Sequence, residues 1–261
     1  MTADSTEQTP PVAICVLSYD GATDLWPPFF DGLFAAWEGL SLPVYLVTNH
    51  KSFDGDPRVT SLSIGEDLDW SSNLIKALDR IPERHILFIF DDFFVRDVDT
   101  ALAQRLMSRC AAEDWPYLTL HPNNYMQEAI EDGIRRISDH GVYRCTLVYA
   151  MCRKDFLLGL LRPGESAWDF EIEGGARARD VRLLSTSQRV FRHYHLLRKG
   201  KWMRPGYPIL SRRYALDRTR PIETRIEYLL RESKEWLFRR YHRIMPPRLI
   251  EQRERRRKTS S

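Results

Sequence analysis

The chain has 261 residues, of which 43% are hydrophobic and 29% charged, and its 39 Lys and Arg against 36 Asp and Glu give a formal net charge of +3. This composition is too apolar and too evenly charged for an intrinsically disordered protein. Four cysteines without C-x-x-C spacing exclude a disulfide scaffold and a zinc ribbon. Unbroken apolar runs, such as residues 86–90, are far too short to span a membrane.

The positive charge is concentrated near the C-terminus. Residues 239–258 contain nine Lys or Arg and two Glu, which leaves the rest of the chain slightly acidic. The basic isoelectric point therefore describes the tail and is poor support for nucleic-acid binding. The first ten residues lack the basic start of a secretory signal, so we expect a cytoplasmic protein with a short flexible leader.

Apolar runs and amphipathic segments alternate in the first part of the chain. Continuous apolar runs bounded by turn residues are typical of parallel strands buried on both faces, and residues spaced by three and four indicate helices. The predicted strands are 12–17, 44–48, 59–64 and 85–90, and the predicted helices are 25–39 and 71–81. This order indicates an α/β fold with a mostly parallel sheet flanked by helices.

The second part of the chain is less regular. We predict a helix at 100–112, a strand at 117–120, an irregular polar stretch at 121–140, a strand at 143–151, helices at 155–161 and 166–178, and strands at 181–186 and 189–195. A long basic amphipathic helix begins near residue 222 and is interrupted at Pro246-Pro247. The expected organisation is a leader (1–10), one domain with two halves (11–96 and 97–215) and a basic helical tail (216–261).

Polar side chains follow three of the predicted strands directly. They are Ser18 and Asp20 after the first strand, Asn49 after the second and Asp91-Asp92 after the most apolar one. Ligands of open parallel sheets bind beyond the carboxyl ends of the strands. We therefore expect these residues to share one binding site.

Asp91 and Asp92 form the strongest chemical signal. Two adjacent carboxylates at the end of a buried strand need a cation, hydrogen-bond donors or solvent. Hard oxygen ligands suit Mg²⁺ or Mn²⁺ that also holds substrate phosphates. The alternative is that one carboxylate caps the following turn and the other pairs with an arginine.

Residues 12–95 resemble the nucleotide-binding half of a GT-A glycosyltransferase similar to the family 2 enzymes. The similarity rests on Ser18-Tyr19-Asp20 after the first strand, Trp70-Ser71-Ser72-Asn73 at a helix start, and Phe90-Asp91-Asp92-Phe93 at the acidic strand end. The chain departs from the family where Ser72 stands in place of a frequent Arg. Its acidic motif is also Asp-Asp-Phe, not Asp-x-Asp.

The resemblance implies a nucleotide-diphosphate sugar as donor. It implies that Ser18, Asp20, Asn49 and Asn73 lie near the nucleoside. Asp91 and Asp92 would lie near the diphosphate, with a divalent cation, Mn²⁺ or Mg²⁺. The half 11–96 would then bind the nucleotide and the half 97–215 the acceptor.

The segment Ser-Ala-Trp-Asp-Phe-Glu at 166–171 is the second constellation, and it resembles the acceptor-side motif of inverting GT-A enzymes. The resemblance implies that Asp169 is the general base and Glu171 an acceptor ligand, or the reverse. Trp168 could stack on an acceptor sugar. The alternative is that both acids lie in a first helical turn because a helix N-terminus favours negative charge.

His193 and His195 alternate and face the same side of a strand. They could complete a metal shell or contact the diphosphate, or they could be ordinary hydrogen-bonding residues. Lys201 lies in the following basic loop, which would suit a lid over a diphosphate leaving group or a solvated surface loop.

The tail supports two hypotheses: it binds an anionic membrane surface, or it packs on the domain. Nucleic acid is unlikely as a partner.

The favoured function is an inverting glycosyltransferase acting on a saccharide or lipid-linked acceptor in cell-surface polysaccharide synthesis, with a peripheral membrane location. One alternative is a metal-dependent phosphohydrolase or nuclease using Asp91, Asp92, Asp169 and His193. The other is a non-catalytic α/β scaffold recruited through its tail.

Overall fold

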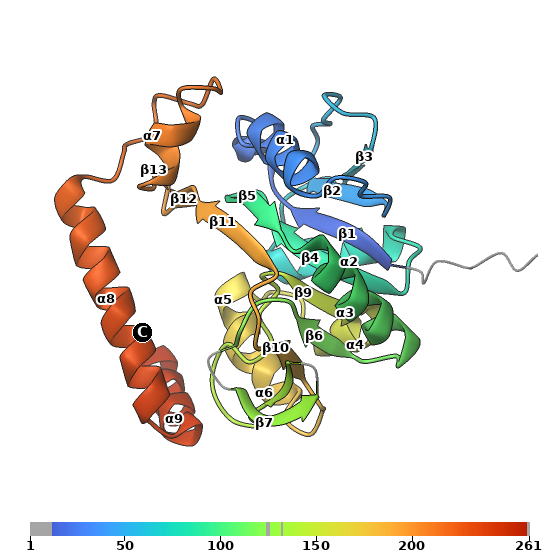
Figure 1. Ribbon diagram of the computed structural model, residues 1–261, viewed down its shortest axis with the longest axis vertical. Coiled ribbons are helices and arrows are strands. Elements are labelled where there is room, and N and C mark those ends of the chain that lie inside the picture. Colours follow the sequence, from blue (N-terminus) through green and yellow to red (C-terminus); the bar gives the residue numbers. More distant parts are fainter. Residues whose placement is uncertain (1–11, 124–125, 132, 260–261) are drawn as a thin grey trace, which may run out of the picture.

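The computed structural model describes residues 12–123, 126–131 and 133–259 and shows an α/β fold with helices flanking one central sheet (Figure 1). The nine strands of this sheet are ordered β3-β2-β1-β4-β9-β6-β10-β8-β7. The predicted leader, residues 1–10, lies outside the described residues. All four cysteines are buried and free, as expected.

The first four strands are parallel neighbours, as predicted. They are β1 (Val12–Leu17), β2 (Val44–Thr48), β3 (Val59–Ser63) and β4 (His85–Phe90). β1 pairs with both β2 and β4. Helices α1 (Trp26–Ala36) and α2 (Trp70–Arg80) lie within two or three residues of their predicted bounds.

Alternation along β1 assigns its two faces to different cores. Val12, Ile14 and Val16 pack in one cluster with α1 and with α3 (Thr100–Ala112), whereas Ala13 and Cys15 pack in a second cluster with α2. Because both faces are covered, the run is apolar throughout. This packing holds the carboxyl ends of β1, β2 and β4 at one rigid edge.

The other half of the sheet is mixed. Its strands are β6 (Tyr117–Thr119), β7 (Met126–Glu131), β8 (Ile134–Ile137), β9 (Ala150–Arg153) and β10 (Leu184–Thr186). β9 runs antiparallel to both β4 and β6, and β10 is parallel to β6 but antiparallel to β8. The sheet is therefore largely parallel only in the half formed by β1 to β4, which come first in the sequence.

Two predictions in this half were wrong. The stretch 121–140, expected to be irregular, contains the β7–β8 pair at the end of the sheet, where polar and charged strand residues are common. The strand expected at 143–151 pairs only from Ala150 onward. Tyr143 and Tyr149 have φ of 62° and 52°, a left-handed conformation outside the β region, so the backbone is not extended at these two residues.

A further strand, β5 (Phe93–Val98), was missed because it follows β4 after only two residues. It pairs antiparallel with β11 (Phe191–His195) in a separate two-stranded sheet, with His195 opposite Phe93. Helix α4 (Lys154–Leu160), which follows β9, agrees with its prediction. The predicted helix 166–178 consists of α5 (Ala167–Asp169), the π-helical η2 (Phe170–Gly174) and α6 (Gly175–Arg177).

The C-terminal part begins with the short pair β12 (Leu197–Arg198) and β13 (Lys201–Trp202), followed by α7 (Gly206–Leu210). The predicted tail helix is α8 (Arg225–Ile244), which runs along one side of the molecule, and α9 (Pro247–Thr259) turns back after Pro246 (Figure 1). Within the described residues, no helix is long and apolar enough to cross a membrane.

Candidate functional site

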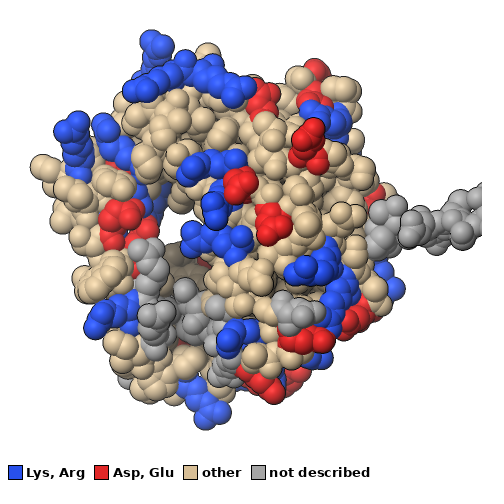
Figure 2. All heavy atoms as spheres, in the orientation of Figure 1, with Lys and Arg blue, Asp and Glu red and all other residues tan. Residues whose placement is uncertain are grey.

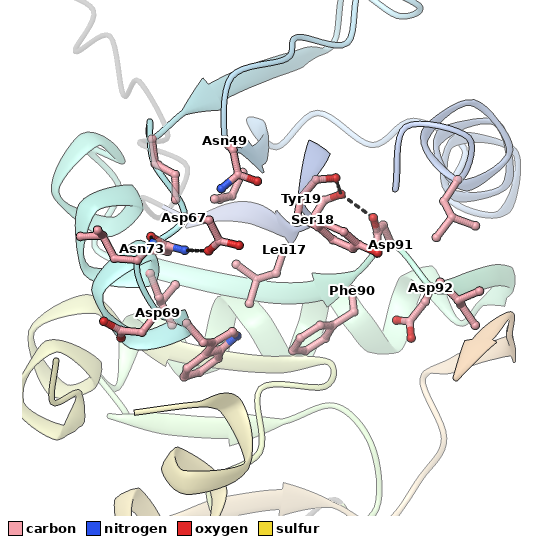
Figure 3. A pocket seen from close by; sticks show the side chains of 17 residues that line it. Leu17, Ser18, Tyr19, Asn49, Asp67, Asp69, Asn73, Phe90, Asp91 and Asp92 are labelled. Carbon is pink, nitrogen blue, oxygen red and sulfur yellow. Dashed lines mark hydrogen bonds between the residues drawn. The ribbon is translucent and has the colours of Figure 1, made fainter. Parts of the chain in front are cut away.

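A pocket of about 540 Å³ lies beyond the carboxyl ends of β1, β2 and β4 (Figure 3). Its wall contains five of the predicted site residues: Ser18, Asn49, Asn73, Asp91 and Asp92. The remaining lining residues are Leu17, Tyr19, Leu25, Val47, Ile64, Asp67, Leu68, Asp69, Trp70, Leu74, Phe90 and Leu197. Figure 3 shows Asn49, Asp67 and Asn73 on one side of the pocket and Asp91 and Asp92 on the other.

Asp91 lines this pocket and is buried, with only 7% of its surface exposed. The Ser18 hydroxyl donates to its carboxylate, and the Trp26 indole in turn donates to Ser18 Oγ at 2.7 Å. Burial raises the pKa of Asp91 to about 8, and the negative charges of Asp92 and Asp24 add to the effect, while the Ser18 hydrogen bond opposes it. Without a nearby cation, Asp91 therefore keeps its proton at neutral pH.

Asp92 also lines the pocket and is more exposed than Asp91. Its carboxylate oxygen is 3.0 Å from His195 Nε2. The imidazole of His195 stacks on Phe93, with ring centroids 4.7 Å apart, because the β5–β11 pairing places these two residues opposite each other. Asp92 and His195, which are 103 residues apart in sequence, thus form one oriented pair.

The part of the chain that the structure describes holds no cluster of three or more His, Cys, Asp or Glu side chains arranged for a metal. Asp92 lines the pocket and its carboxylate lies beside Nε2 of His195, which is not a lining residue, so an oxygen and a nitrogen are close together there, and Asp91 is adjacent. Mg²⁺ and Mn²⁺ sites that act on phosphates often use one or two protein ligands and take the others from water and substrate. This donor set fits such an ion.

Asp20 does not line the pocket. Its carboxylate accepts hydrogen bonds from the backbone N–H groups of Asn49, His50 and Lys51, and its own N–H donates to Asn49 Oδ1 at 3.2 Å. Desolvation raises the pKa of Asp20, but the backbone hydrogen bonds together outweigh it and lower the pKa. In the structure, Asp20 clamps the end of β1 to the end of β2 and so positions Asn49.

Asn73 supports the opposite wall of the pocket. Its side-chain amide donates to Asp67 and its Oδ1 accepts from the Leu68 N–H at 3.4 Å. Asp69 caps α2 by accepting from the Ser72 N–H at 2.8 Å. Sequence reasoning missed Asp67 and Asp69, although an Asp directly before an amphipathic segment is a helix N-cap signal.

Asp169 and Glu171 lie outside the pocket lining. Asp169 forms a reciprocal capping box with Ser166, whose N–H and hydroxyl both donate to it, at 3.1 and 2.7 Å. Glu171 accepts from the Thr146 hydroxyl at 3.0 Å, and burial raises its pKa. Their helical positions place the two carboxylates on different sides.

The segment that carries these acids nevertheless adjoins the pocket. Phe170 contacts Trp70, a lining residue, with ring centroids 5.3 Å apart, and the Ser71 N–H donates to Glu165 O at 3.1 Å. Trp168 is 56% exposed and lies 5.8 Å from the Tyr143 ring. The catalytic role of Asp169 and Glu171 and the acceptor contact of Trp168 stay predictions.

His193 packs edge-to-face against Phe93, with ring centroids 4.7 Å apart, and does not line the pocket. Burial lowers its pKa to about 3, and the neighbouring His121 and His195 add to the effect, so the imidazole is neutral. It packs beside Tyr149 and His121, two residues that sequence reasoning missed. Among the described residues, Tyr149 Oη, His121 Nδ1 and His193 Nδ1 are buried without a hydrogen-bond partner.

Lys201 is directed toward the tail. Its ammonium group lies 2.7 Å from Glu227 of α8, and Arg198 of the same hairpin lies 3.3 Å from Glu235. These ion pairs join the β12–β13 hairpin to α8, while the neighbouring Leu197 lines the pocket. The diphosphate contacts predicted for Lys201 and His193 stay predictions.

Comparison with solved structures identifies proteins that share this fold. No protein-family model and no curated protein matches the chain in sequence. Among solved structures, the mannosyltransferase PcManGT from Pyrobaculum calidifontis in complex with GDP-Man and Mn²⁺ superposes with a TM-score of 0.52 at 14% identity, over 74% of this chain and 59% of that one. S. aureus TarS 1-349 in complex with UDP-GlcNAc superposes with a TM-score of 0.51 at 12% identity, over 72% and 59%. The chain thus spans about three fifths of each structure and shares the fold of both proteins, which confirms the predicted GT-A-like fold class.

Proposed function

We propose that this protein is a glycosyltransferase that takes its sugar from a nucleotide-diphosphate donor. One observation carries the proposal: the pocket at the carboxyl edge of the parallel strands combines amide side chains on one wall with Asp91 and Asp92 on the other. The fold that the chain shares with a mannosyltransferase bound to GDP-Man and with TarS bound to UDP-GlcNAc supports it. Fold alone does not define chemistry, so the pocket is the basis of the proposal.

In this proposal the nucleoside lies beside Asn49 and Asn73, and the diphosphate lies beside Asp92 and His195. A divalent cation, Mn²⁺ or Mg²⁺, would be held by Asp92 with Asp91 and His195 nearby, and it would supply positive charge to the diphosphate leaving group. Asp91 would release its proton when the cation replaces it, because a nearby positive charge lowers a carboxyl pKa. The residues then bind, orient and balance the charge of the donor.

The acceptor is proposed to enter from the side of α5. Asp169 is the proposed general base that takes the proton of the acceptor hydroxyl, and the exposed indole of Trp168 offers a flat surface for a sugar ring. Direct attack of that hydroxyl would invert the anomeric centre. A saccharide or lipid-linked acceptor of cell-surface polysaccharide synthesis is the proposed class.

The proposal is tested by thermal-shift measurements with UDP, GDP and CDP, each with and without Mn²⁺. We expect one nucleoside diphosphate to stabilise the protein most, and Mn²⁺ to enhance that effect. The matching sugar nucleotides are then assayed for release of the nucleoside diphosphate. Equal responses to all three nucleotides, or release of a nucleoside monophosphate and a sugar phosphate in place of a nucleoside diphosphate, would instead favour a phosphohydrolase.

A further inference from the structure

Helix α8 presents its apolar side chains to solvent. Six of them are between 54% and 71% exposed and recur at intervals of three, four and seven along the helix: Ile226, Leu229, Leu230, Trp236, Leu237 and Ile244. We name these six residues the α8 stripe. A helix that packs on a soluble domain normally buries such a stripe, and contiguous exposed apolar surface of this kind marks an interaction site.

The reason for this exposure is that α8 attaches to the body through its charged face. Glu227, Arg231 and Glu235 are spaced by four and therefore share one face of the helix. Glu227 pairs with Lys201 at 2.7 Å, Arg231 with Glu223 at 2.8 Å and Glu235 with Arg198 at 3.3 Å. This face and the α8 stripe are separated by roughly 150° around the helix axis.

The other end of the tail is also fixed. Tyr241 and Met245 pack against the core cluster that contains the buried Ile250 of α9, and Glu251 pairs with Arg179 at 2.5 Å. Figure 2 shows the surface hollowed between α8 and the body of the molecule. Both ends of the tail are thus attached to the body of the molecule. The α8 stripe is accessible to a partner without unfolding of the tail.

The charges beside the α8 stripe define the chemistry of its partner. All three acids of α8 are paired with arginine or lysine: Glu227 with Lys201, Glu235 with Arg198, and Glu232 with Arg231 at 2.8 Å. Arg225, Lys234 and Arg240 are exposed, and Arg225 and Lys234 flank the stripe on opposite sides. Within the described residues, no ion pair joins Arg225 or Lys234 to a carboxylate.

We infer that α8 docks on an anionic lipid surface, with the α8 stripe in the interface and the flanking cations on the headgroups. An interfacial helix with apolar residues on one face, Trp among them, and Lys or Arg beside them has this affinity. A second copy of the chain would bring the same cations against one another, which opposes self-association. The inference does not depend on the proposed transferase activity.

The test uses the full chain and flotation with phosphatidylcholine vesicles that contain or lack phosphatidylglycerol. We expect binding to the anionic vesicles that weakens as salt is added. The double variant Leu230→Gln/Leu237→Gln should lower this binding about tenfold or more. Ile209→Gln, which changes an exposed apolar residue of α7, should bind like the parent chain.

The variant Arg225→Gln/Lys234→Gln/Arg240→Gln separates the charges from the stripe and should lose the preference for anionic vesicles. Melting temperatures and the response to a nucleoside diphosphate, measured on the same preparations, report whether each variant is folded. Unchanged vesicle binding by folded Leu230→Gln/Leu237→Gln would overturn the inference. So would a parent chain that is a dimer in solution, binds no vesicles and becomes monomeric in that variant, since a second copy would then cover the stripe.

Discussion

Asp91-Asp92 and Asp169-Phe170-Glu171 each place two acids close together in the sequence, but the structure surrounds the two pairs differently. Asp91 and Asp92 line a pocket, and burial raises the pKa of Asp91 to about 8. Asp169 instead completes a helix cap with Ser166, and Glu171 accepts a hydrogen bond from the Thr146 hydroxyl. The first pair retains capacity for a ligand, while the second already contributes to local structure.

This contrast separates two physical situations that look alike in a sequence. An acid in a capping box is stabilised by groups three residues away. An acid at the end of a buried strand depends on partners that arrive from distant parts of the chain, as His195 does for Asp92. A perturbed pKa inside a pocket is a stronger sign of function than acidity by itself.

The largest expected effect is that of Asp92→Ala on the proposed transfer reaction. Removing this carboxylate from the pocket lining should lower turnover of the sugar nucleotide by about 10²–10³-fold, the range measured when a charge-stabilising group is removed from an active site. Steady-state kinetics measure this loss. Asp97→Asn changes an exposed acid on β5 and serves as the matched control with parental activity. Parental activity in folded Asp92→Ala would contradict the proposed donor site.

The second comparison is between Asp169→Asn and Ser166→Ala. If Asp169 is the general base, its amide variant should lose transfer by about 10²-fold or more. Ser166→Ala removes the other half of the capping box, so it should lower stability by about 1 kcal/mol while transfer persists. Transfer rates and urea unfolding measure the two effects. Equal transfer rates for both variants would reduce Asp169 to a helix cap.

A smaller effect is expected of Asp91→Asn on the pH dependence of stability. Because the folded-state pKa of Asp91 is raised from 3.8 to about 8, the unfolded chain binds fewer protons than the folded one between these values, and stability falls as pH rises through that window. The amide cannot ionise and should avoid this loss. A pKa shift of this size corresponds to several kcal/mol. Since 1 kcal/mol shifts the melting temperature of a chain of this size by roughly 2–4 °C, we expect the variant to melt at least about 5 °C higher near pH 9.

The same melting curves at about pH 3.5 provide the internal control, because below the ordinary pKa of 3.8 the Asp91 carboxyl is protonated in both the folded and the unfolded chain. Parent and variant should then differ little. Asp97→Asn, on the surface of β5, should follow the parent at both pH values. A parent chain that is as stable near pH 9 as Asp91→Asn would show that Asp91 is not held in its neutral form.

The smallest effect is expected of Asp20→Ala, which removes the clamp between β1 and β2. The pKa of Asp20 is lowered in the folded protein, so its contribution to stability is present above the ordinary pKa and is lost as pH falls through the folded value. At neutral pH we expect a loss of about 1 kcal/mol in urea unfolding, with weaker nucleotide binding because Asn49 loses its support. Asp54→Ala, in an exposed loop, is the control. A loss that persists unchanged at about pH 3 would contradict the clamp.

Local patterns predicted one half of the sheet better than the other. β1, β2 and β4 are continuous apolar runs because both of their faces are covered by helices, and this burial is visible in composition alone. β7 and β8 lie at the far end of the sheet and carry charged residues, and the left-handed Tyr143 and Tyr149 break a run that reads as a strand. Neither feature has a signal in local hydrophobicity.

The sequence by itself determined the α/β class, the strands of the first half and the polar residues that follow them, because each depends on neighbours along the chain. Only the tertiary structure decided which of the predicted site residues line one pocket: Ser18, Asn49, Asn73, Asp91 and Asp92. It also decided that Asp20 instead accepts hydrogen bonds from backbone N–H groups after β2 and that Asp169 caps a helix. It also decided which face of α8 meets the body. The pocket and the covered face of α8 depend on contacts between residues far apart in sequence, and periodicity within one segment shows that a helix has two faces but not which of them is covered.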